Sequence, residues 1–262
     1  MKWTTDAEAA LKKVPFFVRS KVRQSIEGLV NDQNRKLVTL DDVHSAKKRF
    51  LNRMAEDIRG YQADTCFGPS GCPHRAVGCD ALMQQVEKRL AEADLLGFLK
   101  QAVGDQLKYH HEFRVSAAEC PNACSQPQIR DLGIIGAVAP EITDQPCTGC
   151  GSCQDVCPDM AITMDHDRAV PLINDTCQMC GKCVTACPAG TIRAGRTGFR
   201  VQLGGRLGRH PRLGMELPGI LTEAQVLAVL DNALDLYKAR SRKGERFSRL
   251  VTEEDLETVF PG

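Results

Sequence analysis

The chain has 262 residues with 34 basic and 33 acidic side chains, so its formal net charge is only +1. This balance argues against nucleic acid or an anionic membrane surface as a partner, and no apolar run is long enough to span a bilayer. The N-terminus carries charges where a secretory leader needs an apolar core, and 13 cysteines suit metal ligation in a reducing compartment better than disulfides. We therefore expect a soluble cytoplasmic protein.

Residues 1–55 have the pattern of a small helical bundle. A short helix is expected over 6–14, and Pro15 suits the first turn of the next helix, where its missing N–H is harmless. Thr39 followed by Asp42 resembles a capping box before a third helix. The apolar residues that recur at helical spacing are Phe16, Phe17, Val22, Ile26, Val30, Val43, Ala46, Phe50 and Met54. Such a bundle by itself carries no chemistry.

The next stretch, residues 60–80, contains Cys66, Cys72 and Cys79 among glycines and prolines. The Gly and Pro residues between the first two cysteines exclude a regular helix and predict a tight loop. The backbone of such a loop can approach a cofactor closely. Cys79 is either a small buried hydrophobic residue or a spare ligand.

Helix and strand patterns fill the rest of the chain, and the expected fold class is α+β. One long amphipathic helix is expected over 80–103, with an apolar stripe of Leu82, Val86, Leu90 and Leu99. A strand over 113–116 leads into Cys120 and Cys124, and a last helix is expected over 222–237. Further strands are expected at 134–138, 161–164, 169–172 and 199–203.

Eight cysteines form two copies of the spacing C-x2-C-x2-C-x3-C-P, at Cys147, Cys150, Cys153 and Cys157 and again at Cys177, Cys180, Cys183 and Cys187. Bacterial ferredoxins use this run for [4Fe–4S] clusters, and the fourth cysteine of each run ligates the other cluster. One cluster is therefore expected on Cys147, Cys150, Cys153 and Cys187, and a second on Cys157, Cys177, Cys180 and Cys183. Zinc or disulfides are the alternatives, although zinc sites usually have two separated C-x2-C pairs.

Cys66-x5-Cys72 followed by Cys120-x3-Cys124 resembles the cysteine signature of sirohaem-dependent sulfite and nitrite reductases. The flanking residues are similar as well, in the stretches 113–116, 131–136, 198–212 and 245–247. The resemblance implies a mixed α/β half with a third [4Fe–4S] cluster on these four cysteines, and it implies that Cys124 is also the axial thiolate of sirohaem. A bare cluster without sirohaem and a zinc site are the alternatives.

The same resemblance implies basic side chains that bind an oxyanion and the tetrapyrrole carboxylates, for which a planar guanidinium is suited. Arg75 and Arg114 join Cys124 as candidate catalytic residues, and His74 is a further candidate anion ligand. The candidate cofactor-binding residues are Arg206, Arg209, His210 and Arg212. The glycines and the proline among these four residues predict a loop.

The domain organisation follows from a second resemblance. The pattern from Trp3 to Glu27 is similar to the small helical module of light-independent protochlorophyllide reductase, which implies an association with tetrapyrrole or Fe–S partners. We expect this module over 1–55 and a reductase-like domain over 56–143 and 192–262. A two-cluster ferredoxin domain is expected as an insertion over 144–191, as in the dissimilatory sulfite reductases.

Complete sirohaem reductases pair two such halves, and only one is legible here. The oxyanion site is therefore incomplete, completed by self-association, or completed by a partner subunit. The leading hypothesis is a small sulfite or nitrite reductase that carries its own ferredoxin relay and takes electrons from a redox partner or low-potential donor. The alternative is an electron-transfer subunit, resembling a polyferredoxin, that feeds a partner oxidoreductase without sirohaem catalysis. Action on another tetrapyrrole or an organic substrate is a third idea.

Overall fold

The computed structural model describes residues 1–104, 107–165 and 170–260, within which the side chains of residues 51–57, 165 and 170 are not described. The chain divides into two compact units. One consists of Met1–Ile58 with Leu107–Tyr109, and the other of Arg59–Gln106 with His110–Gly262. Within the described ranges, no helix is both long enough and apolar enough to cross a bilayer.

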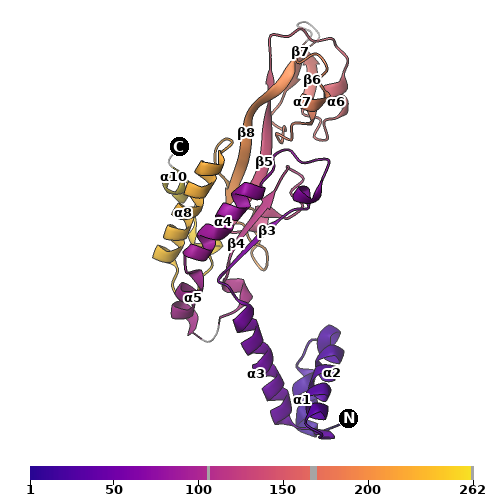
Figure 1. Ribbon diagram of the computed structural model, residues 1–262, viewed down its shortest axis with the longest axis vertical. Coiled ribbons are helices and arrows are strands. Elements are labelled where there is room, and N and C mark those ends of the chain that lie inside the picture. The colour runs from indigo at the N-terminus through magenta and orange to yellow at the C-terminus, as the bar shows by residue number, and fades with distance from the viewer. Residues whose placement is uncertain (105–106, 166–169, 261–262) are drawn as a thin grey trace. The chain divides into compact units, whose positions relative to one another are not determined.

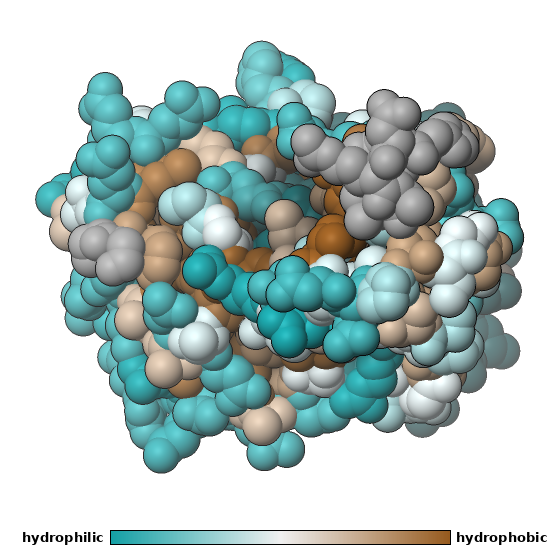
Figure 2. All heavy atoms as spheres, turned by 90° about the horizontal axis from the view of Figure 1, so that it is seen from above, coloured by the Kyte–Doolittle hydropathy of each residue, from teal (hydrophilic) through white to brown (hydrophobic). Residues whose placement is uncertain are grey.

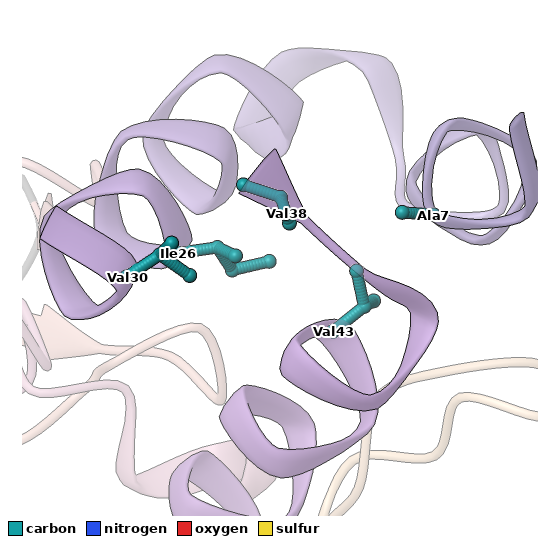
Figure 3. Packing of buried hydrophobic residues seen from close by; sticks show 5 residues of the cluster. All are labelled: Ala7, Ile26, Val30, Val38 and Val43. Carbon is teal, nitrogen blue, oxygen red and sulfur yellow. The ribbon is translucent and has the colours of Figure 1, made fainter. Parts of the chain in front are cut away.

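The smaller unit is built from α1 (Thr5–Lys12), α2 (Phe16–Asp32), α3 (Leu40–Asp57) and a parallel pair of short strands, β1 (Lys2–Trp3) and β2 (Leu37–Val38). Both predicted helix starts are confirmed, because α2 begins after Pro15 and α3 after Thr39. The backbone N–H of Thr39 donates to Asp42 at 2.8 Å, as in a capping box. The core of the unit gathers Ala7, Ile26, Val30, Val38 and Val43 (Figure 3).

The helical pattern predicted three aromatic residues on the buried apolar face, and this prediction is wrong. Phe16, Phe17 and Phe50 are 82%, 75% and 65% exposed. Phe16 and Phe17 are adjacent, so they cannot share one face of a helix. Their rings instead contact each other edge to face, with centroids 5.7 Å apart. The Met54 side chain lies outside the described residues.

The larger unit is organised around a mixed sheet with the strand order β3-β4-β5-β8-β9. Its strands are β3 (Tyr61–Thr65), β4 (Phe113–Ala118), β5 (Leu132–Ile142), β8 (Ile192–Leu203) and β9 (Met215–Glu216). β3, β4 and β5 are parallel, whereas β8 runs antiparallel to both β5 and β9. The sequence pattern predicted parts of β4, β5 and β8, but it missed β3 because only the loop signals after it were recognised.

Helices pack on the sheet beside an aromatic core. The predicted single helix over 80–103 is wrong, since α4 (Asp80–Glu92) and α5 (Leu95–Val103) are separated at Asp94. Asp94 has a φ of 44° and accepts a hydrogen bond from the N–H of Gly97, so it caps a new helix as Asp side chains commonly do. The four predicted stripe residues are buried. α4 packs on β3 and on α8 (Glu223–Arg240), which also packs on β8.

β5 and β8 extend as a long antiparallel pair that carries the segment 143–191 at one end (Figure 1). This segment contains α6 (Ser152–Asp155), α7 (Lys182–Ala186) and the antiparallel pair β6 (Ile162–Asp165) and β7 (Val170–Ile173). Both predicted strands are thus present to within a residue, although Ala169 lies outside the described residues. Seen from this end, hydrophobic residues lie in recesses between hydrophilic ones (Figure 2).

Candidate functional site

The sheet-edge set, defined as Cys66, Cys72, Cys120 and Cys124, is assembled by the topology of the sheet. Cys66 directly follows β3 and Cys120 comes two residues after β4. Because β3 and β4 are parallel, their C-terminal ends lie at the same edge. Burial raises the pKa of the Cys120 thiol, the N–H of Asn122 lowers it, and Cys124, Cys66 and Cys72 raise it further. The N–H of Cys66 donates to the carbonyl oxygen of Ala117 at 2.9 Å, which holds the ends of the two strands side by side.

Hydrogen-bond donors point at two of these sulfurs. The Cys66 Sγ accepts from the backbone N–H of Gly68 at 3.3 Å and of Glu119 at 3.4 Å. The Cys124 Sγ accepts from the Asn122 side-chain amide at 3.0 Å. Cys124 is exposed, whereas the other three cysteines are half-buried, so its sulfur can make a further bond to a group outside this unit.

Glu119 is a site residue that the sequence analysis missed. It is fully buried, and its Oε1 accepts a hydrogen bond from the backbone N–H of Cys79 at 2.9 Å. Its carbonyl oxygen accepts from the N–H groups of Ala76 and Val77, so it ties the 66–79 loop to the end of β4. A lone acidic residue beside Cys120 was the only signal in the sequence.

Gly68 and Cys79 fit around the Glu119 carboxylate. A Cβ on Gly68 would clash with Glu119 Oε2, so the glycine leaves room for this side chain. Cys79 is completely buried, and burial, followed by the negative charge of Glu119, raises its pKa to about 12. A thiol with this pKa stays protonated, which matches the prediction of a small buried hydrophobic residue.

Arg75 and His74 lie beside the sheet-edge set. The Arg75 Nε is 3.4 Å from Glu119 Oε2, and its Nη2 is 3.9 Å from Asp80. Arg75 is half exposed and lines an open groove of about 1200 Å³. The groove is bordered by the loop after Cys72 and by the start of α7, with Pro73, His74, Arg75, Ala76, Cys180, Gly181 and Lys182 among its lining residues.

Arg114 lies at the opposite end of β4 from Cys120. Its backbone N–H donates to Asp131 at 3.0 Å. Burial lowers its pKa, and the nearby Arg246 lowers it further. Asp131 is buried and also pairs with Arg246 at 3.3 Å. The structure therefore does not bring the Arg114 backbone together with the cysteines.

The predicted cofactor-binding loop is a hairpin closed by Arg206 and Arg212, whose backbones exchange hydrogen bonds at 2.8 and 3.0 Å. Both guanidinium groups donate to the carbonyl oxygen of Ser248, and that of Arg212 also donates to Gly204 at 2.9 Å. These contacts hold the hairpin against the C-terminal part of the unit. Arg209 and His210 are exposed at its tip.

The two cysteine runs fold as equivalent loops. In the first, Gly149 and Gly151 have positive φ values of 67° and 74°, and in the second Met179 and Gly181 have values of 57° and 73°. Gly151 precedes α6 and Gly181 precedes α7. Each run therefore wraps its first cysteines around a left-handed turn before a short helix.

Each of two cavities combines three cysteines of one run with the fourth cysteine of the other run. One cavity is bordered by the first set, Cys147, Cys150, Cys153 and Cys187. The other is bordered by the second set, Cys157, Cys177, Cys180 and Cys183. Each encloses about 310 Å³, open solvent included. Among the described residues, no three His, Cys, Asp or Glu side chains converge on the position of a single metal ion.

The environments of these thiols differ within each set. Burial raises the pKa of Cys183 to about 11, and the neighbouring Cys177 and Cys180 raise it too. The pKa of Cys187 is lowered, because several backbone N–H groups, including that of Ile192 at 3.4 Å, outweigh its slight burial. Ala161 donates in the same way to Cys157 at 3.2 Å. Backbone donors thus point at the exchanged cysteine of each run.

Known families match two parts of the chain. Residues 63–260 match the family described as the nitrite and sulphite reductase 4Fe-4S domain. The chain belongs to this family. Residues 3–47 also match the family of the proto-chlorophyllide reductase 57 kD subunit. Both resemblances found in the sequence are therefore confirmed.

Individual relatives match parts of this chain. It is 34% identical over 136 residues to the coenzyme F420-dependent sulfite reductase of Methanocaldococcus jannaschii. The aligned stretch covers 52% of this chain and 22% of that protein. It is 42% identical over 50 residues to a subunit of the light-independent protochlorophyllide reductase of Halorhodospira halophila, covering 19% of this chain and 10% of that protein. The chain thus corresponds to less than a quarter of either relative.

A solved structure has a similar fold. Dissimilatory sulfite reductase I superimposes with a TM-score of 0.52 at 15% identity, covering 81% of this chain and 56% of that chain. At this identity the likeness concerns the fold alone, which is a mixture of helices and sheet.

Proposed function

We propose that the chain is an iron–sulfur component of a sulfite or nitrite reductase, with three [4Fe–4S] clusters. The sheet-edge set holds one cluster, which is joined to sirohaem through Cys124. The first and second sets hold ferredoxin-type clusters that relay electrons from a low-potential donor. The observation that carries this proposal is that the loops bearing Cys66, Cys72, Cys120 and Cys124 leave the same edge of the sheet in a chain of this family.

The donor sets fit these groups better than zinc. Thiolates at the corners of a cube-shaped cluster are farther apart than thiolates on one ion. The two cavities, each bordered by four cysteines, suit the cluster. N–H donors at Cys66, Cys157 and Cys187 would stabilise the added negative charge of the reduced state.

Sirohaem supplies the multi-electron reduction chemistry when it is bound. Cys124 would hold the sirohaem iron, because it is the exposed member of the sheet-edge set. Arg75 and His74 border the adjoining groove and would bind carboxylates or an oxyanion there. Glu119 anchors Arg75 and limits the directions in which its guanidinium can point. Arg209 and His210 are exposed and could meet a second half.

A relay subunit without sirohaem is the second candidate. It is favoured by the engagement of Arg206 and Arg212 with backbone carbonyls and by the position of Arg114 away from Cys120. These contacts leave few of the predicted basic residues beside the cysteines. Under this reading the sheet-edge cluster would pass electrons to a partner oxidoreductase.

Anaerobic purification tests both candidates. Three cube-shaped clusters require about twelve irons per chain, and sirohaem adds one iron with sharp tetrapyrrole bands in the visible spectrum. A preparation with twelve irons and a broad absorbance alone would support the relay subunit. Zinc in place of iron and labile sulfide would contradict both candidates.

Two matched variants locate the third cluster. Cys72→Ala removes a proposed ligand of the sheet-edge set and should lower the iron content by about four atoms per chain. Cys79→Ala alters a nearby cysteine that is buried and protonated, and it should keep all twelve. Equal iron loss in both variants would count against the ligand assignment.

A further inference from the structure

The second set lies close to the sheet-edge set along β5. A Cβ on Gly136 would be 2.7 Å from the carbonyl oxygen of Glu119, which precedes a sheet-edge cysteine. Only two residues further, Val138 forms a β-bridge with Cys180, and its N–H donates to the carbonyl oxygen of Met179 at 2.7 Å. At a strand rise of roughly 3.3 Å per residue, the two contacts are about 7 Å apart along the strand.

The first set lies beyond the far end of the same strand. The β5–β8 ladder ends at the pair Ile142 and Ile192, and the N–H of Thr143 then donates to the carbonyl oxygen of Thr191 at 2.8 Å. Thr191 and Ile192 border the cavity of the first set. Thr143 is seven residues from Gly136, which corresponds to about 23 Å of extended chain.

The open groove gives independent support for this order. The loop that follows Cys72 and the segment that begins at Cys180 line the same groove. A Cβ on Gly181 would lie 3.0 Å from the Val138 side chain, so α7 starts directly against β5. A sheet-edge loop and a second-set loop therefore face one another across a single space.

From these contacts we infer that the second set holds the inner ferredoxin-type cluster and the first set the outer one. This order deepens the proposed function and rests on it. Electrons from a donor would then reach the sheet-edge set from the first set by way of the second set. Each transfer would move one electron from a reduced cluster to the next, oxidised one, and no bond would break. Direct transfer from the first set to the sheet edge would have to bypass the second.

Magnetic coupling between reduced clusters tests the order in the full-length protein. Coupling falls steeply with distance, so the electron paramagnetic resonance spectrum reports which clusters are neighbours. The pair Cys147→Ala/Cys150→Ala removes the cluster of the first set, and the remaining two clusters should still show coupled signals. The matched pair Cys177→Ala/Cys180→Ala should leave two signals without coupling. The reverse pattern, or equal coupling in both variants, would overturn the order.

Iron analysis separates this inference from the proposed function. Each double variant should retain about eight irons and the wild type about twelve. A wild type without three clusters would refute the proposed function, whereas three clusters with the reversed coupling pattern would refute the order alone.

If a double variant fails to fold, aspartate variants provide the same information. Cys147→Asp and Cys177→Asp each keep an oxygen ligand, so the altered cluster stays and is marked by a shifted reduction potential. The cluster that is magnetically coupled to the sheet-edge cluster should be the one whose reduction potential is shifted by Cys177→Asp. A shift of that cluster by Cys147→Asp instead would contradict the inferred order.

Discussion

Glu119 connects the two loops that carry the sheet-edge set. Its backbone N–H donates to Cys66, its carboxylate accepts from Cys79, and Arg75 lies 3.4 Å from the second carboxylate oxygen. A buried carboxylate is costly unless it has such partners. We therefore regard Glu119 as a positioning residue that fixes the 66–79 loop and orients Arg75 at the groove.

Glu119→Gln should lower the free energy of unfolding by about 1–3 kcal/mol, because a buried charge-assisted contact is lost. It should also raise the reduction potential of the sheet-edge cluster, since a nearby negative charge disfavours added electrons. Denaturant unfolding and a potentiometric titration measure the two effects. Glu87→Gln is the control, because Glu87 is 59% exposed and pairs with Arg59 at 3.7 Å. Equal effects of the two substitutions would show that Glu119 has no special position.

At the scale of elements, the start of α3 shows how one side chain stabilises a helix. The Asp42 carboxylate accepts from the Arg35 guanidinium at 2.7 and 2.8 Å and from the Thr39 N–H at 2.8 Å. The hydrogen bond from Arg35 is the largest cause that lowers the pKa of Asp42, from 3.8 to about 2. Asp42 thus stabilises the folded unit in its ionised form.

Asp42→Ala should lower the free energy of unfolding of the smaller unit by about 1–2 kcal/mol at neutral pH. Because the folded pKa is depressed, the wild-type contribution is complete above pH 3.8 and is lost as the pH falls toward 2. The difference between wild type and variant should shrink over the same interval. Asp41→Ala, at an exposed neighbouring position, should cost only about 0.5 kcal/mol through the helix dipole. A pH-independent difference would contradict the assigned role.

β5 is the element that joins the cysteine loops. Its central residues contact the sheet-edge loop at Gly136 and the second set at Val138. Its last residues pair with β8 beside the first set. One strand therefore spaces all three sets, and the rise of an extended chain determines their order.

At the scale of the whole molecule, the two units should respond differently to the loss of iron. Trp3 is the single tryptophan of the chain. Its Nε1 donates to Glu27 at 2.7 Å, and the Arg23 guanidinium lies 4.5 Å from its ring. Its fluorescence therefore reports on the smaller unit. The proposed cysteine ligands all belong to the larger unit.

Chelation of iron should therefore lower the melting temperature of the larger unit by several degrees or more, because cluster binding contributes directly to folding. The transition followed by Trp3 fluorescence should move by no more than about 1–2 °C. Far-ultraviolet circular dichroism and fluorescence, recorded on the same anaerobic samples, measure the two transitions. A coupled shift of both would show that the units do not unfold independently.

Features that depend on neighbouring residues could be predicted from the sequence. The exchanged cysteine runs, the loop after Cys66, and the helix starts at Pro15 and Thr39 all follow from local spacing or local backbone chemistry. Each involves residues a few positions apart, or a repeat whose register is visible in the chain. The family resemblance likewise depended on short cysteine spacings.

Contacts between residues that are far apart in the chain became visible only in the folded structure. Glu119 contacts Cys66 and Cys79 from about forty or more positions away. Arg206 and Arg212 bind the Ser248 carbonyl instead of remaining free. Phe16 and Phe50 stay exposed. The order of the cysteine sets also depends on the register of β5 with its neighbours. Such contacts arise from chain topology and from competition for buried space, and periodicity along the sequence reports neither.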